Sequence, residues 1–142
     1  MTLYDRFAAV IAAWNAGDID AALAGMDEAV VWHVAAGALA PLDGKAAVRG
    51  FLEALRADMA ETRWSIGHHA EAGDRLFVEG IDAYTRRTGT AVAMPYAAVI
   101  EFADDRIVAW RDYIDTRRME KLREGAPAPA HVVALVARLR QD

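Results

Sequence analysis

Two aspartates stand in segments whose other residues are mostly apolar or aromatic. Asp112 belongs to residues 104–115, where strand alternation places it on one face with Val108, Trp110 and Ile114. An ionised carboxylate is rarely buried unless another group pairs with it or a reaction uses it. Asp112 is therefore the first candidate for a reactive group.

Asp82 occupies a comparable position in a second predicted strand, from 74 to 87. Its strand face also carries Leu76, Val78, Gly80 and Tyr84. Gly80 has no side chain, so it could open space for a ligand beside the carboxyl group. Because neither face of this strand is purely apolar, the pattern alone does not decide which face points inward.

The two aspartates could act together if their strands pair in sequence order. The strand predicted at 90–103 would then lie between them, presenting Met94, Tyr96, Ala98 and Ile100. Two strand spacings separate the backbones by about 9–10 Å. Burial would raise both pKa values, and mutual repulsion would raise one further, which creates an acid–base pair. The alternative is that each aspartate pairs with an arginine or faces water at a rim.

Other candidates carry weaker signals. His68 alternates with Trp64 and Ile66, so it could line the same cavity, although a hydrogen-bonded core histidine gives the same pattern. Trp32 fits either the core or a ligand wall. With four histidines, no cysteine and no spaced ligand set, we expect no metal. The sequence also lacks a phosphate loop, a nucleophile elbow and a dinucleotide fingerprint, and we expect no cofactor.

The elements that must position these residues are helices followed by strands. Apolar spacing predicts helices at 2–16, from Asp18 to about 26, from Asp43 to about 59, at 116–124 and at 131–140, and strands at 28–34, 61–72, 74–87, 90–103 and 106–115. This order indicates one α+β domain over residues 1–142, with a curved, mostly antiparallel sheet and helices on one face. Such a sheet forms a cup suited to a small molecule.

Composition narrows the class of protein. Of 142 residues, 55% are hydrophobic and 26% charged, as in ordinary globular chains. The net charge of −5 argues against nucleic acid and anionic membranes as partners. No window approaches the roughly 18 apolar residues of a membrane span, and no export signal is visible, so we expect a cytoplasmic protein.

The order of elements and the stretch from Asp104 to Asp115 resemble the SnoaL-like group of the NTF2-like (cystatin-like α+β) superfamily. Within that group, the limonene-1,2-epoxide hydrolase branch is the most similar in look. The resemblance covers nearly the whole chain, including Trp14-Asn15-Ala16-Gly17-Asp18 and the helix start at Asp43-Gly44-Lys45. It implies an α+β cone closed by N-terminal helices.

The resemblance also implies roles for the two aspartates. In the epoxide hydrolases, a carboxylate at the position of Asp112 activates water, and one at the position of Asp82 protonates the epoxide oxygen. Three further site positions differ here, because Gly80 replaces a bridging Arg, Trp32 a Tyr and Val34 an Asn. Related ketosteroid isomerase-like enzymes and polyketide cyclases need one carboxylate and an oxyanion donor, which could be Tyr96, Tyr84 or protonated Asp82.

Two functions are therefore open. The first is an enzyme that uses Asp112 as base and Asp82 as acid on a hydrophobic substrate, with a binding wall formed by Tyr96, Tyr84, Trp32, His68, Met94, Trp110 and Gly80. The second is a ligand-binding or assembly module without turnover. We also expect a homodimer, because the outer face of a curled sheet needs cover, and Arg111, Ala109, Phe77 and Ile81 could supply that face.

Overall fold

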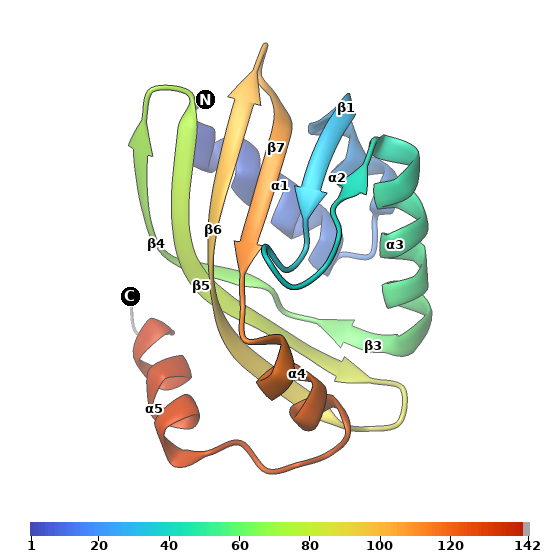
Figure 1. Ribbon diagram of the computed structural model, residues 1–142, viewed down its shortest axis with the longest axis vertical. Coiled ribbons are helices and arrows are strands. Elements are labelled where there is room, and N and C mark those ends of the chain that lie inside the picture. Colours follow the sequence, from blue (N-terminus) through green and yellow to red (C-terminus); the bar gives the residue numbers. More distant parts are fainter. Residues whose placement is uncertain (141–142) are drawn as a thin grey trace.

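A strongly curled sheet and the helices packed against it make up the fold of the computed structural model, which describes residues 1–140 (Figure 1). The helices are α1 (Leu3–Asn15), α2 (Ile19–Ala24), α3 (Lys45–Asp58), α4 (Thr116–Arg123) and α5 (Ala130–Leu139). The strands are β1 (Met26–His33), β2 (Leu42–Asp43), β3 (Met59–Thr62), β4 (Ser65–Ala72), β5 (Arg75–Arg86), β6 (Ala91–Ala103) and β7 (Arg106–Tyr113). Among these described residues, we find no helix with the length and apolar character to cross a membrane.

Side-chain caps define where the N-terminal helices begin. Thr2 accepts a hydrogen bond from the backbone of Asp5, and the Asp5 carboxylate accepts one from the backbone of Thr2, which forms a capping box on α1. Asp18 caps α2 through the backbone N–H of Ala21. Both caps agree with the helix starts predicted from the sequence.

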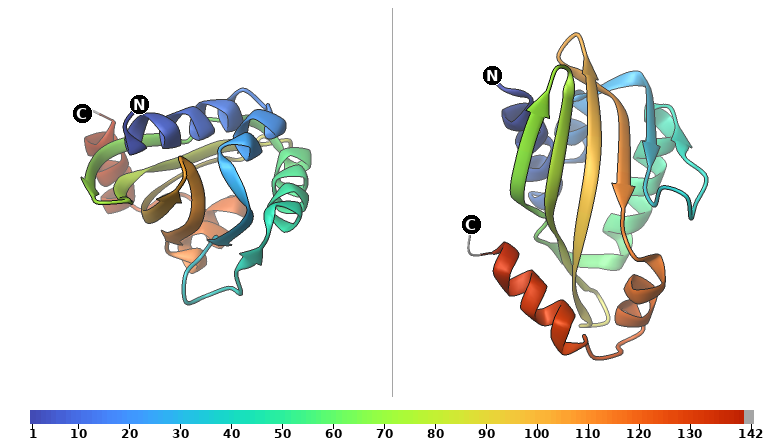
Figure 2. Two further views of the ribbon diagram at one scale, coloured as in Figure 1. Left: turned by 90° about the horizontal axis from the view of Figure 1, so that it is seen from above. Right: turned by 60° about the vertical axis from the view of Figure 1, so that its left-hand side comes forward.

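The sheet order confirms the neighbourhood predicted for the two aspartates. The strands follow the order β2-β1-β7-β6-β5-β3, and β4 also pairs with β5. The pairs β5–β6 and β6–β7 are antiparallel, so β6 lies between the strands that carry Asp82 and Asp112. β1 runs parallel to β7, which completes a mostly antiparallel sheet. The sheet curls around the space that α1 and α3 close (Figure 2).

The single strand predicted from 61 to 72 is wrong, because β3 and β4 are separate strands along one edge of β5. Thr62 pairs with Tyr84 and Ser65 with Ile81, so the register is the same on both sides of the break and brings Trp64 opposite Asp82. Each backbone hydrogen-bonding group of Trp64 is held by the Asn15 side chain, with both distances at 2.8 Å. These bonds replace the strand pairing lost at the break.

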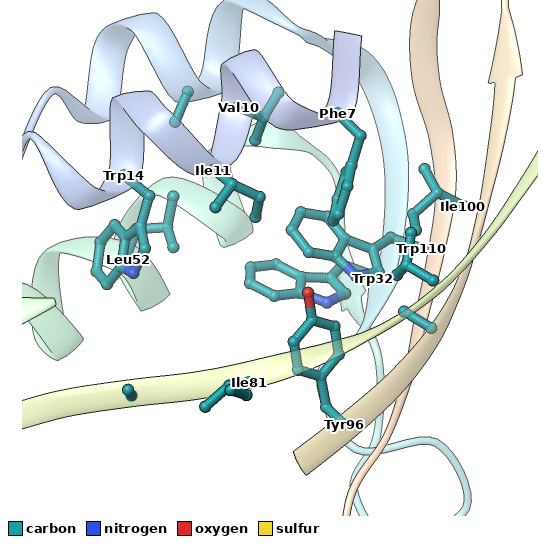
Figure 3. Packing of buried hydrophobic residues seen from close by; sticks show 14 of the residues in the cluster. Phe7, Val10, Ile11, Trp14, Trp32, Leu52, Ile81, Tyr96, Ile100 and Trp110 are labelled. Atoms are coloured by element: carbon teal, nitrogen blue, oxygen red, sulfur yellow. The ribbon is translucent and has the colours of Figure 1, made fainter. Parts of the chain in front are cut away.

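The core lies between α1 and the concave face of the sheet, and α5 covers part of the opposite face. Phe7 and Trp14 point from α1 toward the sheet (Figure 3), and both are almost fully buried. Ile81 faces away from Asp82 on β5 yet is 1% exposed, because α5 packs against β5 and β6. The prediction that helices cover a single face is therefore wrong for α5, and Ile81 is unavailable to an outer surface.

Candidate active site

The carboxyl group of Asp112 is held between two tryptophans. The indole Nε1–H of Trp32 donates to Oδ2 at 2.8 Å, and that of Trp110 donates to Oδ1 at 2.9 Å. Parallel pairing of β1 with β7 aligns Trp32 with Trp110, and their rings stack with centroids 4.3 Å apart. Asp112 is 5% exposed. Its two oxygens are therefore fixed in place, and each keeps lone-pair capacity beyond the indole bond.

Asp82 lies on the same sheet face as Asp112 but at a different position along the strands. Asp82 pairs with Met94 across β5 and β6, while Asp112 pairs with Ala98 across β6 and β7. Residues directly opposite in an antiparallel pair share a face, so the unbroken register turns both carboxyl groups to the concave side. Within residues 1–140, neither carboxyl group forms an ion pair, and Asp82 has no hydrogen-bond partner.

Both aspartates line one apolar cavity of about 80 Å³. The wall is otherwise aromatic and aliphatic, and it consists of Trp14, Trp32, Val34, Phe51, Leu55, Met59, Trp64, Tyr96 and Ile114. These residues come from α1, β1 and the residue after it, α3, β3, the β3–β4 break, β6 and the chain after β7. Only the folded chain brings such distant segments together. The described residues contain no group of three His, Cys, Asp or Glu side chains arranged for a metal ion.

The environment separates the pKa values of the two carboxyl groups. Burial raises the pKa of Asp112 to about 8, against the opposing effect of the Trp32 and Trp110 N–H groups, and the charge of Asp82 raises it further. Burial raises the pKa of Asp82 to about 6, and the positive charge of Arg123 moderates this increase. Near pH 7, Asp82 is therefore mainly ionised and Asp112 mainly protonated.

Tyr96 reaches the cavity by crossing Gly80. The two residues are directly paired on β5 and β6, and the Tyr96 hydroxyl donates to the Ser65 carbonyl at 3.1 Å. A Cβ at Gly80 would lie 2.1 Å from the Ser65 oxygen and 2.9 Å from the Tyr96 hydroxyl oxygen. Gly80 thus makes room for a phenol ring and a neighbouring strand. The space it leaves is filled by protein, contrary to the expected opening for a ligand.

The other expected wall residues divide between the cavity and its surroundings. Trp32 lines the cavity. Trp110 does not line it, but its N–H donates to Asp112, which does. Tyr84 is buried with its hydroxyl on the Met119 sulfur at 3.3 Å, and burial raises its pKa to about 12. Met94 is buried opposite Asp82 without lining the cavity.

His68 lies outside the cavity. The register on β5 shifts between Ile66 and His68, so the alternation that turns Trp64 and Ile66 inward is broken at this point. His68 is exposed, and its Nδ1 contacts the Glu79 carboxylate at 3.1 Å. The expectation that His68 lines the cavity is wrong because a bulge turns the histidine to the other face.

Several wall residues carry no distinctive signal in the sequence. Alternation marks Trp64 only as a neighbour of His68, and the helical period places Trp14, Phe51 and Leu55 on the apolar faces of helices. The same period predicts Met59 at the end of a helix, whereas the structure places it at the start of β3. A helix face that packs on a core and one that borders a cavity have the same apolar period. No sequence signal joins Asn15 to Trp64, because the two residues are 49 positions apart and only the structure brings them together.

A family model described as a SnoaL-like domain matches residues 7–110, so the chain belongs to the SnoaL-like family. No protein with a curated description matches the sequence.

Solved structures share the fold at low sequence identity. An NTF2-like protein of unknown function from Burkholderia pseudomallei is 23% identical over 86% of this chain and 98% of its own, with a TM-score of 0.76. A candidate polyketide cyclase from Pseudomonas putida is 23% identical over 82% and 94%, with a TM-score of 0.74. An LEH-like epoxide hydrolase from M. tuberculosis is 24% identical over 96% of both chains, with a TM-score of 0.74. These likenesses confirm the predicted NTF2-like fold and the predicted resemblance.

Proposed function

We propose that this protein is a small-molecule enzyme that performs acid–base chemistry on an apolar substrate with Asp82 and Asp112. The observation that carries the proposal is that both carboxyl groups line one apolar cavity without an ionic partner among the described residues. Placing two unpaired acids in an apolar site costs folding free energy, and active sites are where such costs are common.

The order of the pKa values favours one assignment of roles. A base must be ionised and an acid protonated at the working pH. With a pKa of about 6, Asp82 meets the first condition near pH 7, and with a pKa of about 8, Asp112 meets the second. The proposed base is therefore Asp82 and the proposed acid Asp112, which reverses the roles that the family resemblance implied.

Proton transfer next to a carbonyl is the reaction class that the wall favours. In this step Asp82 takes a proton from the carbon, the C–H electron pair moves toward the carbonyl oxygen, and Asp112 donates its proton or a hydrogen bond to that oxygen. Epoxide opening also needs a held water. The two positions that hold this water in the epoxide hydrolases are occupied here by Trp32 and Val34. The Trp32 N–H is already bonded to Asp112, and Val34 has no polar side-chain atom.

Hydrogen exchange into model ketones tests the proposal whatever the natural substrate is. Enolisable ketones would be incubated with the protein in D₂O, and loss of the α-proton signal would be followed by NMR, alongside a panel of epoxides assayed for diol. We expect exchange above the buffer rate. Asp82→Asn should abolish it, whereas Asp112→Asn should lower it and keep a measurable fraction, because the base Asp82 is still present. The carboxamide nitrogen of this variant would face one of the two indole N–H donors, so its fold would be checked by circular dichroism first. Complete loss in Asp112→Asn alone would restore Asp112 as the base.

One observation favours a second function, a ligand-binding module without turnover. Both Asp112 oxygens already accept protein N–H groups, which is also how a purely structural carboxyl group is satisfied. This alternative predicts that wild-type protein binds apolar ligands but exchanges no α-proton and opens no epoxide. Exchange that depends on Asp82 would reject it.

We also propose a homodimer formed through the outer sheet face. Phe77 and Tyr113 are 41% and 51% exposed there, beside the half-buried Ala109 and Arg111. Exposed aromatic side chains on a sheet face commonly mark a protein contact.

A cytoplasmic location remains a prediction from the sequence.

A further inference from the structure

The indole N–H of Trp64 has no hydrogen-bond acceptor although it is buried. Its Nε1 atom is excluded from solvent, and no atom of residues 1–140 accepts a hydrogen bond from it. Most buried donors in folded proteins are paired, because an unpaired one destabilises the fold. Because the Trp64 side chain lines the cavity, an oxygen of a molecule that enters the cavity is one acceptor that could pair with this N–H.

Neighbouring donors on the same wall are already occupied. Trp32 and Trp110 donate to Asp112, and the Tyr96 hydroxyl donates to the Ser65 carbonyl. Figure 3 shows the Tyr96 hydroxyl directed toward the two stacked indoles. The Trp64 N–H faces the Tyr96 oxygen closely enough to moderate the raised pKa of Tyr96, without reaching hydrogen-bond geometry. Trp64 thus keeps its donor for another oxygen.

Trp64 is held in position from two directions. Asn15 fixes its backbone through hydrogen bonds to both N–H and C=O. Its ring lies between those of Tyr96, at 5.3 Å in an edge-to-face contact, and Trp110, at 5.6 Å. Because the register sets Trp64 opposite Asp82, the donor and this carboxyl group border the same part of the cavity. A donor fixed in this way is preorganised, as a binding site requires.

We propose that Trp64 is the hydrogen-bond donor that binds an uncharged oxygen of the ligand, either a carbonyl or an epoxide oxygen. The cavity is small and apolar apart from the two acids, so the ligand is a compact molecule whose oxygen lies on Trp64 while its carbon skeleton contacts Phe51, Leu55 and Met59. The consequence for turnover rests on the proposed function, because only then does the held oxygen bring a reacting carbon beside Asp82. Binding itself requires no reaction.

The four indole signals of ¹⁵N-labelled protein provide a direct readout, since the chain has four tryptophans. Each signal would be assigned with a Trp→Phe variant. Cyclohexanone, cyclohexene oxide and methylcyclohexane would then be titrated into the wild type. We expect the Trp64 indole proton to move downfield with the ketone or the epoxide and not with the hydrocarbon, and the larger shift identifies the preferred oxygen. No shift, or an equal shift with methylcyclohexane, would overturn the proposal.

Affinity measurements separate the hydrogen bond from cavity shape. Trp64→Phe should weaken cyclohexanone binding about tenfold and leave methylcyclohexane binding unchanged. Trp14→Phe, which alters an indole on the same wall, should affect both probes alike, and Asn15→Ala should weaken the ketone selectively but less than Trp64→Phe does. Equal losses for both probes in Trp64→Phe would contradict the assignment. Ketone binding through Trp64 without α-proton exchange would keep this inference and reject the proposed function.

Discussion

Trp32 and Trp110 are direct partners in the parallel pairing of β1 with β7, and their stacked rings donate N–H groups to the two oxygens of one carboxyl group. The parallel register makes this possible, because it brings two identical side chains to the same height on neighbouring strands. Hydrogen bonds of this kind favour the ionised carboxyl group, whereas burial favours the neutral one. The balance leaves Asp112 with a pKa of about 8.

Removing one indole donor should raise the pKa of Asp112 above its present value. Trp110→Phe deletes the N–H on Oδ1 and keeps an aromatic ring in the stack. A hydrogen bond to a charged group is worth about 1.5–3 kcal/mol, so we expect an increase of about one to two pH units. The pKa would be measured by ¹³C NMR titration of the aspartate carboxyl groups.

Trp14→Phe serves as the control for this titration, because Trp14 makes no hydrogen bond to Asp112. Its effect on the pKa of Asp112 should be clearly smaller. A pKa that falls in Trp110→Phe would show that ring packing, rather than the N–H group, sets the titration of Asp112.

The stability of the protein should decrease as pH rises toward 8. Folded Asp112 has a pKa of about 8, while an unfolded aspartate titrates near 3.9. Between these values the folded state keeps a proton that the unfolded chain has released. The stabilisation is complete below about pH 4 and falls by about 1.4 kcal/mol per pH unit until the folded pKa is reached. Asp82 contributes in the same direction only up to about pH 6.

Urea unfolding at pH 6, 7 and 8 would measure this slope. Asp82→Asn should retain the slope between pH 6 and 8, and Asp112→Asn should lose most of it. If the two variants behave alike in this range, the neutral form of Asp112 is not what links stability to pH.

Gly80→Ala should destabilise the fold. The added Cβ would come within 2.1 Å of the Ser65 carbonyl oxygen, a backbone atom that cannot turn away, and would press on the Tyr96 hydroxyl. We expect a loss of about 1–3 kcal/mol in the free energy of unfolding, measured by urea titration.

Gly50→Ala is the matched control for Gly80→Ala. Gly50 lies in α3, and a Cβ there would meet nothing within 4 Å. Alanine is the better helix former by about 0.5–1 kcal/mol, so this variant should be slightly more stable than the wild type. A neutral Gly80→Ala would mean that β4 can move away from β5 without cost.

Phe77→Glu should convert the proposed dimer to a monomer of 15.5 kDa. A charge on the outer sheet face would be desolvated in the dimer without a partner. Light scattering coupled to gel filtration measures the mass directly. Val133→Glu, on the exposed side of α5 at 55% exposure, is the control and should leave the mass unchanged. A wild-type mass near 15.5 kDa would reject the dimer itself.

Local pattern was enough to locate most elements and to single out both aspartates. The caps at Thr2 and Asp18, the long strands β5 and β6, and the face shared by Asp82 and Gly80 depend on contacts between residues near in sequence or on strict alternation. Such features are encoded within a few residues, so they can be predicted from one chain.

Other features depended on irregularities that alternation cannot anticipate. The break between β3 and β4 leaves the register unchanged, so Trp64 stays on the inner face, whereas a bulge after Ile66 turns His68 outward. A change of one residue in register moves a side chain to the opposite face, so small irregularities decided which residues reached the cavity. Gly80 was predicted to open space, but its neighbours in space filled it.

The sequence by itself determined which acids stand among apolar residues and which strands carry them. Only the tertiary structure decided that Trp32, 80 residues from Asp112, donates to that carboxyl group, and that Asn15 holds Trp64 across 49 residues. The physical reason is that pKa values and free donors depend on burial and on partners in space. Those partners come from strand register and helix packing, which a one-dimensional pattern does not contain.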